Sequence, residues 1–510
     1  MQKFCIQPGS LSLEILAAAF EGPIEIQLES QCWENVKRSH QAVLDLLASG
    51  DSIYGLNTGF GLLAHQQIPA ADLAQLQLNL VRSHCAGVGD LLEDSVVRLV
   101  MLLKLASLAR GYSGVRPAVI ESLVACFNAG VLPCIPSQGS VGASGDLAPL
   151  AHMSLALIGE GSVRLQGVAM PAKEALDRLR IPPLVLGPKE GLALINGTQV
   201  STSLAFAGFF DCQKVFSAAV VAGAMSVDAA KGSDTPFDER IHEIRNHRAQ
   251  QDCARAYREL LRDSQIRQSH RDCSRVQDPY SLRCQPQVMG ACLDSIRHAG
   301  RVLVDEANAV SDNPLVFFEE GAILSGGNFH AQPVAMVADM LANAIAEIGS
   351  LSERRIALLI DRHLSELPSF LTNDGGLNSG FMIPQVTAAA LTSENKHLAS
   401  SVSVDSLPTS ANQEDHVSMA TYAARRLGPM NENAAKIIAI ELLAACQGIE
   451  FRLPLKTSPK LTSVYQQLRE VVPFYEQDRP FHDDISWVSQ NMVCDRRIGS
   501  LVGQELWCPT

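Results

Sequence analysis

The sequence predicts a mainly α-helical fold, and the spacing of its apolar residues is the reason. Several unusually long segments keep the 3.6-residue hydrophobic period of helices, near residues 202–230, 288–311, 333–365 and 430–450. Alternating patterns typical of strands are scarce and limited to short pieces such as residues 24–28. We therefore expect an N-terminal globular region with glycine-rich loops, residues 1–195, followed by a long-helix bundle and C-terminal region, residues 196–510.

The first strongly periodic segment spans residues 92–110, where apolar residues from Val96 to Ala106 form one stripe and Gly111 supplies a stop signal. Later segments are apolar on more than one side, as in residues 335–346. Helices that are apolar all round must be buried in a bundle or in a subunit interface. We therefore expect an oligomer.

Size and charge exclude several classes of protein. A chain of 510 residues, 47% of them hydrophobic, can bury two or three packed regions. Its formal net charge of -13 repels phosphate backbones, so we expect no nucleic-acid partner. The most apolar stretches, such as residues 216–227, fall short of the roughly 18 to 20 residues that cross a bilayer. With no signal-like N-terminus, we expect a cytoplasmic protein without a membrane partner.

Cysteine and histidine spacing gives no sign of a metal site. The 13 cysteines contain no C-x-x-C pair, which favours reduced thiols over a disulfide framework or a zinc site. His242 and His247 are five residues apart, which turns them about 140° away from each other on a helix. We expect no bound metal.

Two glycine-rich loops stand out, residues 54–61 and 139–146. The second begins the stretch GSVGASGDLAPLAH, which lacks the lysine of a P-loop and the spacing of a nucleophile elbow. Asp146 is expected to be the N-cap of a helix over residues 147–158, with Pro149 tolerated in its first turn. On spacing alone, a tight glycine loop leading into a helix is the favoured interpretation.

The same stretch resembles the self-processing motif of the aromatic amino acid ammonia-lyase and aminomutase family. That resemblance implies a fumarase/aspartase-like superfamily architecture and a protein-derived cofactor, 4-methylidene-imidazol-5-one (MIO), built from Ala143, Ser144 and Gly145 with no external cofactor. The Gly145 nitrogen would attack the Ala143 carbonyl carbon, and loss of water from Ser144 would leave the methylidene. A nearby helix N-terminus would favour negative charge on the ring.

Such an electrophile turns the substrate amine into a usable leaving group, after which a base removes the β-proton. The resemblance gives that base as Tyr54, in YGLNTGFG, although a tyrosine beside glycines also suits a simple turn. An ordinary phenol pKa is near 10, so this role needs surroundings that favour phenolate. Asn196, in LINGT, matches the asparagine that holds the ring and the substrate carboxylate, against the alternative of an Asn-Gly turn.

The remaining matches lie in three segments. Gln277, Tyr280 and Arg283 belong to QDPYSLRCQPQ, whose two prolines are expected to prevent a regular helix. Arg283 has the two-pronged geometry that clamps a carboxylate, and Tyr280 is assigned to catalysis by the resemblance. Phe329 and Glu414 correspond to ring-contacting positions that neighbouring subunits usually contribute, which implies a homotetramer with shared active sites.

Substrate choice in this family depends on the pair occupied here by Ser83 and His84. Phenylalanine-specific members carry Phe-Leu and tyrosine-specific members His-Leu, whereas Ser-His with Glu414 is similar to the histidine-specific pattern. The resemblance thus implies L-histidine as substrate, with trans-urocanate and ammonia as products in the first step of histidine degradation. An imidazole can satisfy a histidine and a carboxylate, whereas a phenyl ring would leave both unpaired at about 1–3 kcal/mol per group. Cys85 departs from the alanine of many relatives.

Three alternatives remain at this point. A tyrosine or phenylalanine ammonia-lyase or aminomutase would share the loop but not Ser83-His84 with Glu414. A fumarase-type lyase would carry a Gly-Ser-Ser-x-Met-Pro-x-Lys loop, which the sequence lacks. A non-enzymatic scaffold of the same fold predicts damage at Ser144, Tyr54 or Arg283, and all three are intact.

Overall fold

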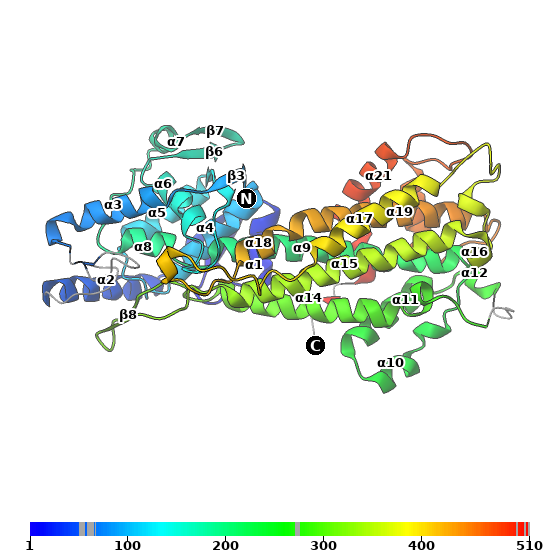
Figure 1. Ribbon diagram of the computed structural model, residues 1–510, viewed down its shortest axis with the longest axis horizontal. Coiled ribbons are helices and arrows are strands. Elements are labelled where there is room, and N and C mark those ends of the chain that lie inside the picture. Colours follow the sequence, from blue (N-terminus) through cyan, green and yellow to red (C-terminus); the bar gives the residue numbers. More distant parts are fainter. Residues whose placement is uncertain are drawn as a thin grey trace. The chain divides into compact units, whose positions relative to one another are not determined.

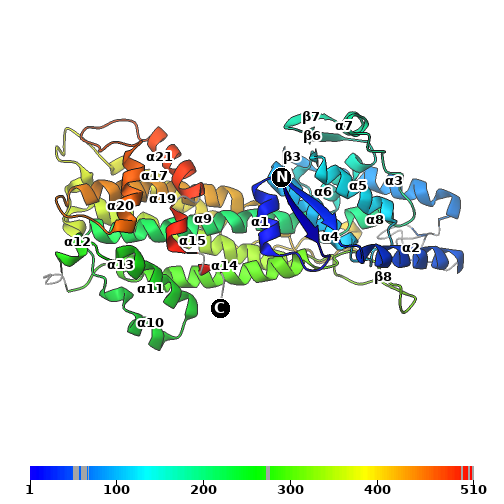
Figure 2. The same cartoon turned by 180° about the vertical axis from the view of Figure 1, so that it is seen from behind.

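The computed structural model describes residues 1–49, 57–58, 66, 68–270, 276–495, 498–503 and 506–507. Helices dominate these residues, and the strands form only small sheets of two or three (Figures 1 and 2), so the predicted mainly α class is confirmed. Internal contacts divide the chain into two compact units. Unit 1 combines Met1–Ala207, Gly300–Asp339 and Ser401–Arg425, and unit 2 combines Gly208–Ala299, Met340–Ser400 and Arg426–Thr510.

This division differs from the single boundary expected between residues 195 and 196. Three of the five observed borders fall inside α9 (Gln199–Ala229), α14 (Gln285–Ala307) and α15 (Gln332–Ile360). Each unit is assembled from three separate segments of the chain. One cut along the sequence cannot describe units of this kind, because the chain leaves unit 1 and returns to it twice.

Unit 1 begins with a parallel strand pair, β1 (Gln2–Ile6) and β2 (Ile24–Leu28), joined by α1 (Leu13–Glu21). The strand expected at residues 24–28 is therefore confirmed. The other small sheets are antiparallel: β3 (Val88–Leu91) pairs with β5 (Pro136–Gln138), β6 (Ser162–Leu165) lies between β4 (Val131–Pro133) and β7 (Val168–Pro171), and β8 (Leu315–Phe317) pairs with β9 (Ala322–Leu324).

Helix α4 (Asp94–Leu108) forms the centre of unit 1 and confirms the helix expected over residues 92–110. Residues on all its sides are buried, and it packs against α1 and α5 (Pro117–Asn128). The other helices of this unit are α2 (Cys32–Ser49), the 3-10 turn η2 (Ala70–Asp72), α3 (Leu73–His84), α6 (Leu147–Leu157), α7 (Ala172–Leu179), α8 (Glu190–Ile195) and α18 (Ala420–Arg425).

Three of these helices, α3, α6 and α8, pack against one another in pairs. Each has one end at a predicted site residue. Helix α3 ends at His84, α6 begins directly after the Ala-Ser-Gly loop, and Asn196 is the C-cap of α8. Their mutual packing therefore determines where the three predicted site segments lie.

In unit 2, long helices run side by side (Figures 1 and 2). The four expected long helices are confirmed as α9, α14, α15 and α19 (Leu427–Glu450). A break at Asp361 separates α15 from α16, and the Asp361 side chain accepts from the His363 amide there. Shorter helices complete the unit: α10 (Glu239–Arg245), α11 (Arg248–Leu261), α12 (Gln265–Gln268), α13 (Tyr280–Arg283), α16 (Arg362–Ser365), α17 (Met382–Leu398), α20 (Pro459–Arg469) and α21 (His482–Val488).

The core of unit 2 contains a fully buried ion pair among apolar side chains. Arg355 on α15 and Glu441 on α19 are both 0% exposed and meet through two parallel hydrogen bonds of 2.5 and 2.8 Å. Ser226 and Ser352 donate to the same carboxylate. Shared hydrogen bonds of this kind compensate the large cost of removing two charges from water.

Helices α9 and α15 contain longer apolar stretches than the sequence analysis predicted. Each contains an 18-residue stretch that is long and apolar enough to cross a bilayer, contrary to the expectation that no stretch reached that length. In the structure, 78% and 72% of these stretches are buried. Burial at this level is the environment of core helices in a bundle.

Candidate active site

Residues 139–146 connect β5 to α6 and carry the predicted electrophile precursor. Two glycines of this loop have a left-handed backbone, Gly142 with φ +63° and Gly145 with φ +73°. A Cβ on Gly142 would lie 2.3 Å from Ser418 Oγ, and one on Gly145 would lie 2.2 Å from Gly197 O. Both positions therefore require glycine for conformation and for space.

Two segments distant in sequence hold this loop. On one side, Gly145 pairs with Gly197, and the Asp146 amide donates to Gly197 O at 2.8 Å. On the other side, Ser418 Oγ donates to Gly142 O at 2.9 Å, and the Met419 amide donates to Val141 O at 2.8 Å. The loop is thus fixed by backbone hydrogen bonds on both sides of the Ala-Ser-Gly tripeptide.

Asp146 has a different role from the N-cap that its position suggested. The expected helix exists as α6, and Asp146 stands at its N-cap position, but its side chain does not accept from the amides of α6. One carboxylate oxygen accepts from the amide and hydroxyl of Ser201 at 2.7 and 2.9 Å. The other accepts from Ser140 and Thr421 at 2.8 and 2.7 Å. This buried carboxylate therefore ties the loop to the first turn of α9 and to α18.

Ser144 brings three predicted site residues together. Its hydroxyl donates to Oε1 of Glu414 at 2.6 Å, and its carbonyl accepts from Nδ2 of Asn196 at 3.2 Å. Thr409 donates to the second Glu414 oxygen at 2.8 Å and orients that carboxylate. Ala143, the preceding residue, is 4% exposed. The precursor tripeptide is therefore buried at Ala143, and at Ser144 it is hydrogen bonded by both Glu414 and Asn196.

The backbone carbonyl of Leu80 sets the tautomer of His84. Its Nδ1 lies 2.8 Å from that carbonyl, which can only accept, so Nδ1 carries a proton, and in the neutral ring Nε2 is an acceptor. Burial lowers the pKa of His84 below its ordinary value, while the Leu80 carbonyl and the Glu414 charge act in the opposite direction. His84 is therefore within electrostatic reach of the carboxylate that contacts Ser144.

Phe329 lies in the segment between β9 and α15 and is half-buried. The residues that follow it meet the electrophile loop and the Glu414 segment. The Ala331 amide donates to Gly142 O at 3.4 Å, and the His330 ring stacks on that of His416 with centroids 5.5 Å apart. The structure thus places the Phe329 segment next to the loop.

Gln277, Tyr280 and Arg283 form a group of their own in unit 2. Arg283 donates to Asp278 O at 3.0 Å, and its guanidinium carbon lies 4.5 Å from the centre of the Tyr280 ring. Gln277 and Arg283 line a pocket of about 450 Å³. Tyr280 is 71% exposed. Tyr54, the predicted base, lies outside the described residues.

The two prolines do not exclude helix from this segment, although no single helix spans it, because α13 ends at Arg283 and α14 begins at Gln285. Pro279 is the N-cap of the short helix α13, and Pro286 falls in the first turn of α14. Amide groups in a first helical turn have no partner within the helix, so proline loses nothing there. Proline in this segment marks where two helices begin.

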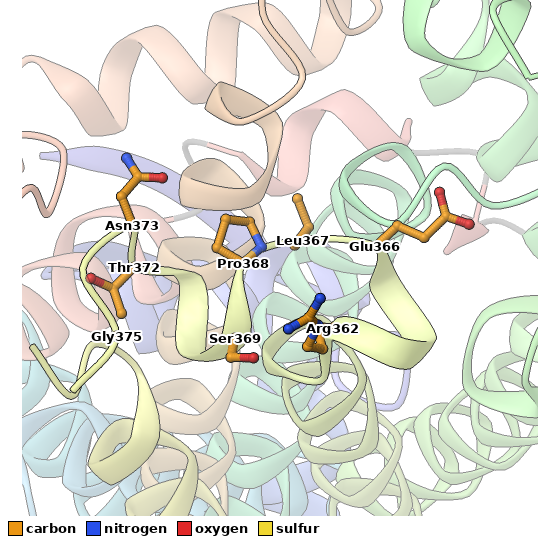
Figure 3. Close-up of a pocket in the computed structure, with 8 residues that line it drawn as sticks. All are labelled: Arg362, Glu366, Leu367, Pro368, Ser369, Thr372, Asn373 and Gly375. Carbon is orange, nitrogen blue, oxygen red and sulfur yellow. The ribbon is translucent and has the colours of Figure 1, made fainter.

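A second pocket in unit 2 contains none of the predicted site residues. Its volume is about 660 Å³, and it is lined by residues around α16 and the turn that follows: Arg362, Glu366, Leu367, Pro368, Ser369, Thr372, Asn373 and Gly375 (Figure 3). This pocket shares no lining residue with the pocket that Gln277 and Arg283 line.

Lys104 was missed by the sequence reasoning. It is 1% exposed on α4, and its ammonium group donates to Asn196 O at 2.6 Å and to Ala193 O at 3.2 Å. A signal was available, because Lys104 interrupts the otherwise apolar run MLLKLASL. Lysine is almost never fully buried unless it has hydrogen-bond partners, so such an interruption indicates a partner inside the fold.

Comparison with known proteins identifies the family of this chain. The sequence matches the aromatic amino acid lyase family over residues 11–470. It is 58% identical over 504 residues to the histidine ammonia-lyase of Desulfotalea psychrophila, covering 99% of this chain and 98% of that protein. It is 59% identical over 486 residues to the histidine ammonia-lyase of Vibrio cholerae, covering 95% of each.

A solved structure with the same fold is the histidine ammonia-lyase from Trypanosoma cruzi, at a TM-score of 0.90 and 39% identity. The match covers 100% of this chain and 96% of that one. Sequence and fold therefore agree over nearly the full length, and the loop of residues 139–146 lies within the matched residues. The chain belongs to the aromatic amino acid lyase family and is a carbon–nitrogen lyase.

Proposed function

We propose that this protein is a histidine ammonia-lyase, which converts L-histidine to trans-urocanate and ammonia without oxidation. The observation that carries the proposal is the contact between Ser144 and Glu414 at 2.6 Å, with His84 in electrostatic reach of that carboxylate. Near-full-length relatives at 56–59% identity bear the same name. Both the polar groups and the relatives therefore favour histidine within the family.

The loop fits the MIO group that the family implies. Gly145 has no Cβ and a φ of +73°, which frees its nitrogen side for close approach. Asn196 donates to the carbonyl of Ser144, while its own Oδ1 is buried with no partner among the described residues. We infer that Ala143, Ser144 and Gly145 form the group and that Asn196 holds it. Once formed, it supplies the electrophile that makes the substrate amine a leaving group.

The Glu414 carboxylate is an acceptor, and Nε2 of His84 is a second acceptor because the His84 Nδ1 proton is donated to Leu80. An imidazole carries an N–H group that can donate to one of them, whereas a phenyl ring carries none. A phenyl ring would leave that acceptor without a partner in a partly buried site, at a cost of about 1–3 kcal/mol. This difference is the physical basis of the proposed preference for histidine over phenylalanine.

The remaining roles rest on the family resemblance. Tyr54 serves as the base for the β-proton, Tyr280 assists catalysis, Arg283 and Gln277 bind the carboxylate end of the substrate, and Phe329 packs against the substrate ring. We propose that a cytoplasmic homotetramer combines these groups from neighbouring subunits. Exposed side chains beside Arg283 support this, since Val276 is 95% and Tyr280 71% exposed. Light scattering on the purified protein tests the tetramer.

The purified protein incubated with L-histidine is expected to release ammonia and to accumulate urocanate, seen as new ultraviolet absorption. L-Phenylalanine and L-tyrosine are expected to react far more slowly. A preference for tyrosine, or a β-amino acid as product, would overturn the substrate assignment but not the electrophile. Intact mass tests the electrophile separately, because cyclisation and dehydration remove two water molecules per chain.

A further inference from the structure

Lys104 is a buried lysine whose ammonium group contacts the turn formed by Asn196 and Gly197. Its two acceptors, Ala193 O and Asn196 O, stand at the C-terminal end of α8. The last carbonyls of a helix have no partner within the helix, and a cation at that end is favoured by the helix dipole. Lys104, on α4, therefore donates hydrogen bonds to carbonyls at the C-terminal end of α8 that have no partner within that helix.

The charges around Lys104 show that it is not simply one half of an ion pair. Asp312 and Asp146 are the nearby carboxylates, and Lys189 is the nearby cation. Asp312 is engaged by Lys189 at 2.7 Å, and Asp146 accepts from Ser140, Ser201 and Thr421. Burial lowers the pKa of Lys104 to about 7, whereas the two carboxylates act to raise it. The direct hydrogen bonds of its ammonium are those to the two carbonyls.

The turn that Lys104 supports holds the electrophile loop at two points. Asn196 donates through Nδ2 to Ser144 O, and Gly197 accepts from the Asp146 amide while pairing with Gly145. The direction of the Asn196 side chain depends on the position of its own backbone. The hydrogen bond from Lys104 to Asn196 O, at 2.6 Å, constrains that backbone directly.

We propose that Lys104 is a positioning residue for the proposed reaction, which holds the Asn196–Gly197 turn so that the Asn196 amide stays on the Ser144 carbonyl. It touches neither the substrate nor the reacting atoms and acts through Asn196. Its loss is expected to lower kcat much more than it changes KM, because the proposed contacts of Arg283 and Gln277 with the substrate carboxylate do not depend on Lys104. This inference rests on the proposed function, so the experiment includes a test of each.

The test is a double-mutant cycle with Lys104→Met, Asn196→Ala and the double variant, measured as kcat and KM for L-histidine. Lys104→Met keeps the length and apolar body of the side chain and removes the donor. We expect it to lower kcat at least tenfold with KM changed less than threefold. In the Asn196→Ala background the same change should lower kcat less than twofold further. Equal losses in both backgrounds would show that Lys104 acts independently of Asn196 and would overturn the proposal.

Leu103→Ala is the matched control, because Leu103 is the neighbouring residue on α4 and is also buried, at 2% exposed. It weakens the same helix without removing the bond to Asn196, so its effect on kcat should be the same in both backgrounds. Intact mass of every variant reports the fraction of chains that lost two waters, and kcat is expressed per such chain. If Lys104→Met does not fold, Lys104→Leu, which also has no donor, takes its place with the same criteria. Wild-type protein that yields no urocanate would instead refute the proposed function.

Discussion

The Ser144 hydroxyl lies 2.6 Å from Oε1 of Glu414, although the two residues are 270 positions apart in the sequence. In the proposed function, the Ser144 hydroxyl is the oxygen that would leave as water when the electrophile forms, and Glu414 is the proposed partner of the substrate ring. Formation of the electrophile and substrate recognition would then share one carboxylate.

Ser144→Ala is expected to lower kcat for L-histidine by several orders of magnitude, because the variant has no hydroxyl to lose as water. Intact mass should show that it does not lose two waters, whereas wild type does. The fold should persist, since Ser144 is half-buried and the change removes one side-chain bond. Borohydride should inactivate wild type by reducing the methylidene. Activity near wild type in Ser144→Ala would remove Ser144 from the precursor.

Glu414→Gln keeps the shape of the side chain and removes its charge. We expect kcat/KM for L-histidine to fall about 100-fold, the size of effect seen when one preorganised polar group is lost from an active site. The melting temperature should change little because Glu414 is half-buried. The variant should also lower the pKa of His84 further, since the Glu414 charge favours the protonated ring. Equal losses on every aromatic substrate would contradict a role in ring recognition.

His84→Phe replaces a polar acceptor by an apolar wall at the end of α3. Turnover of L-histidine should weaken by about 10-fold to 100-fold, corresponding to about 1–3 kcal/mol for one lost polar partner. The variant should also gain slow activity on L-phenylalanine, measured by the ultraviolet absorption of the cinnamate that is released. His84→Asn, which retains polar groups, serves as the control and should show no such gain.

Arg283→Lys tests the carboxylate clamp. A lysine retains the charge but cannot form the two parallel hydrogen bonds of a guanidinium, so kcat/KM should fall by roughly 10-fold or more. Arg283 is partly exposed and bonds to Asp278 O, so thermal stability should be nearly unchanged. Steady-state kinetics with L-histidine provides the measurement. An unchanged kcat/KM would place Arg283 outside the site.

Arg355→Met tests the buried ion pair of unit 2. It leaves the Glu441 carboxylate without its cation in a fully buried site, and we expect a loss of about 3–5 kcal/mol. Combining it with Glu441→Leu removes the stranded charge and should recover a large part of that loss. Thermal unfolding of both variants gives the comparison. A double variant less stable than Arg355→Met would show that the carboxylate is stabilising without its partner.

Periodicity alone was enough for the mainly α class and the four long helices, and glycine content indicated the loop of residues 139–146. The proposed role of Ala143, Ser144 and Gly145 in that loop came from the family resemblance. Local residue order carries these features, since apolar residues every three or four positions produce a buried helix face wherever they occur. The domain division could not be obtained in this way. Its borders at residues 207, 299 and 339 fall inside continuous helices, where the local pattern does not change.

Within the candidate site, the sequence by itself determined which residue types are available, including the glycines that alone fit at positions 142 and 145. Tertiary structure decided which groups meet. Asp146 looked like a helix cap, but packing placed Ser201 and Thr421 around its carboxylate. Lys104 was not singled out from the sequence, but packing of α4 placed its ammonium at the end of α8. The physical reason is that buried polar groups must find hydrogen-bond partners, and those partners come from segments that only folding brings together.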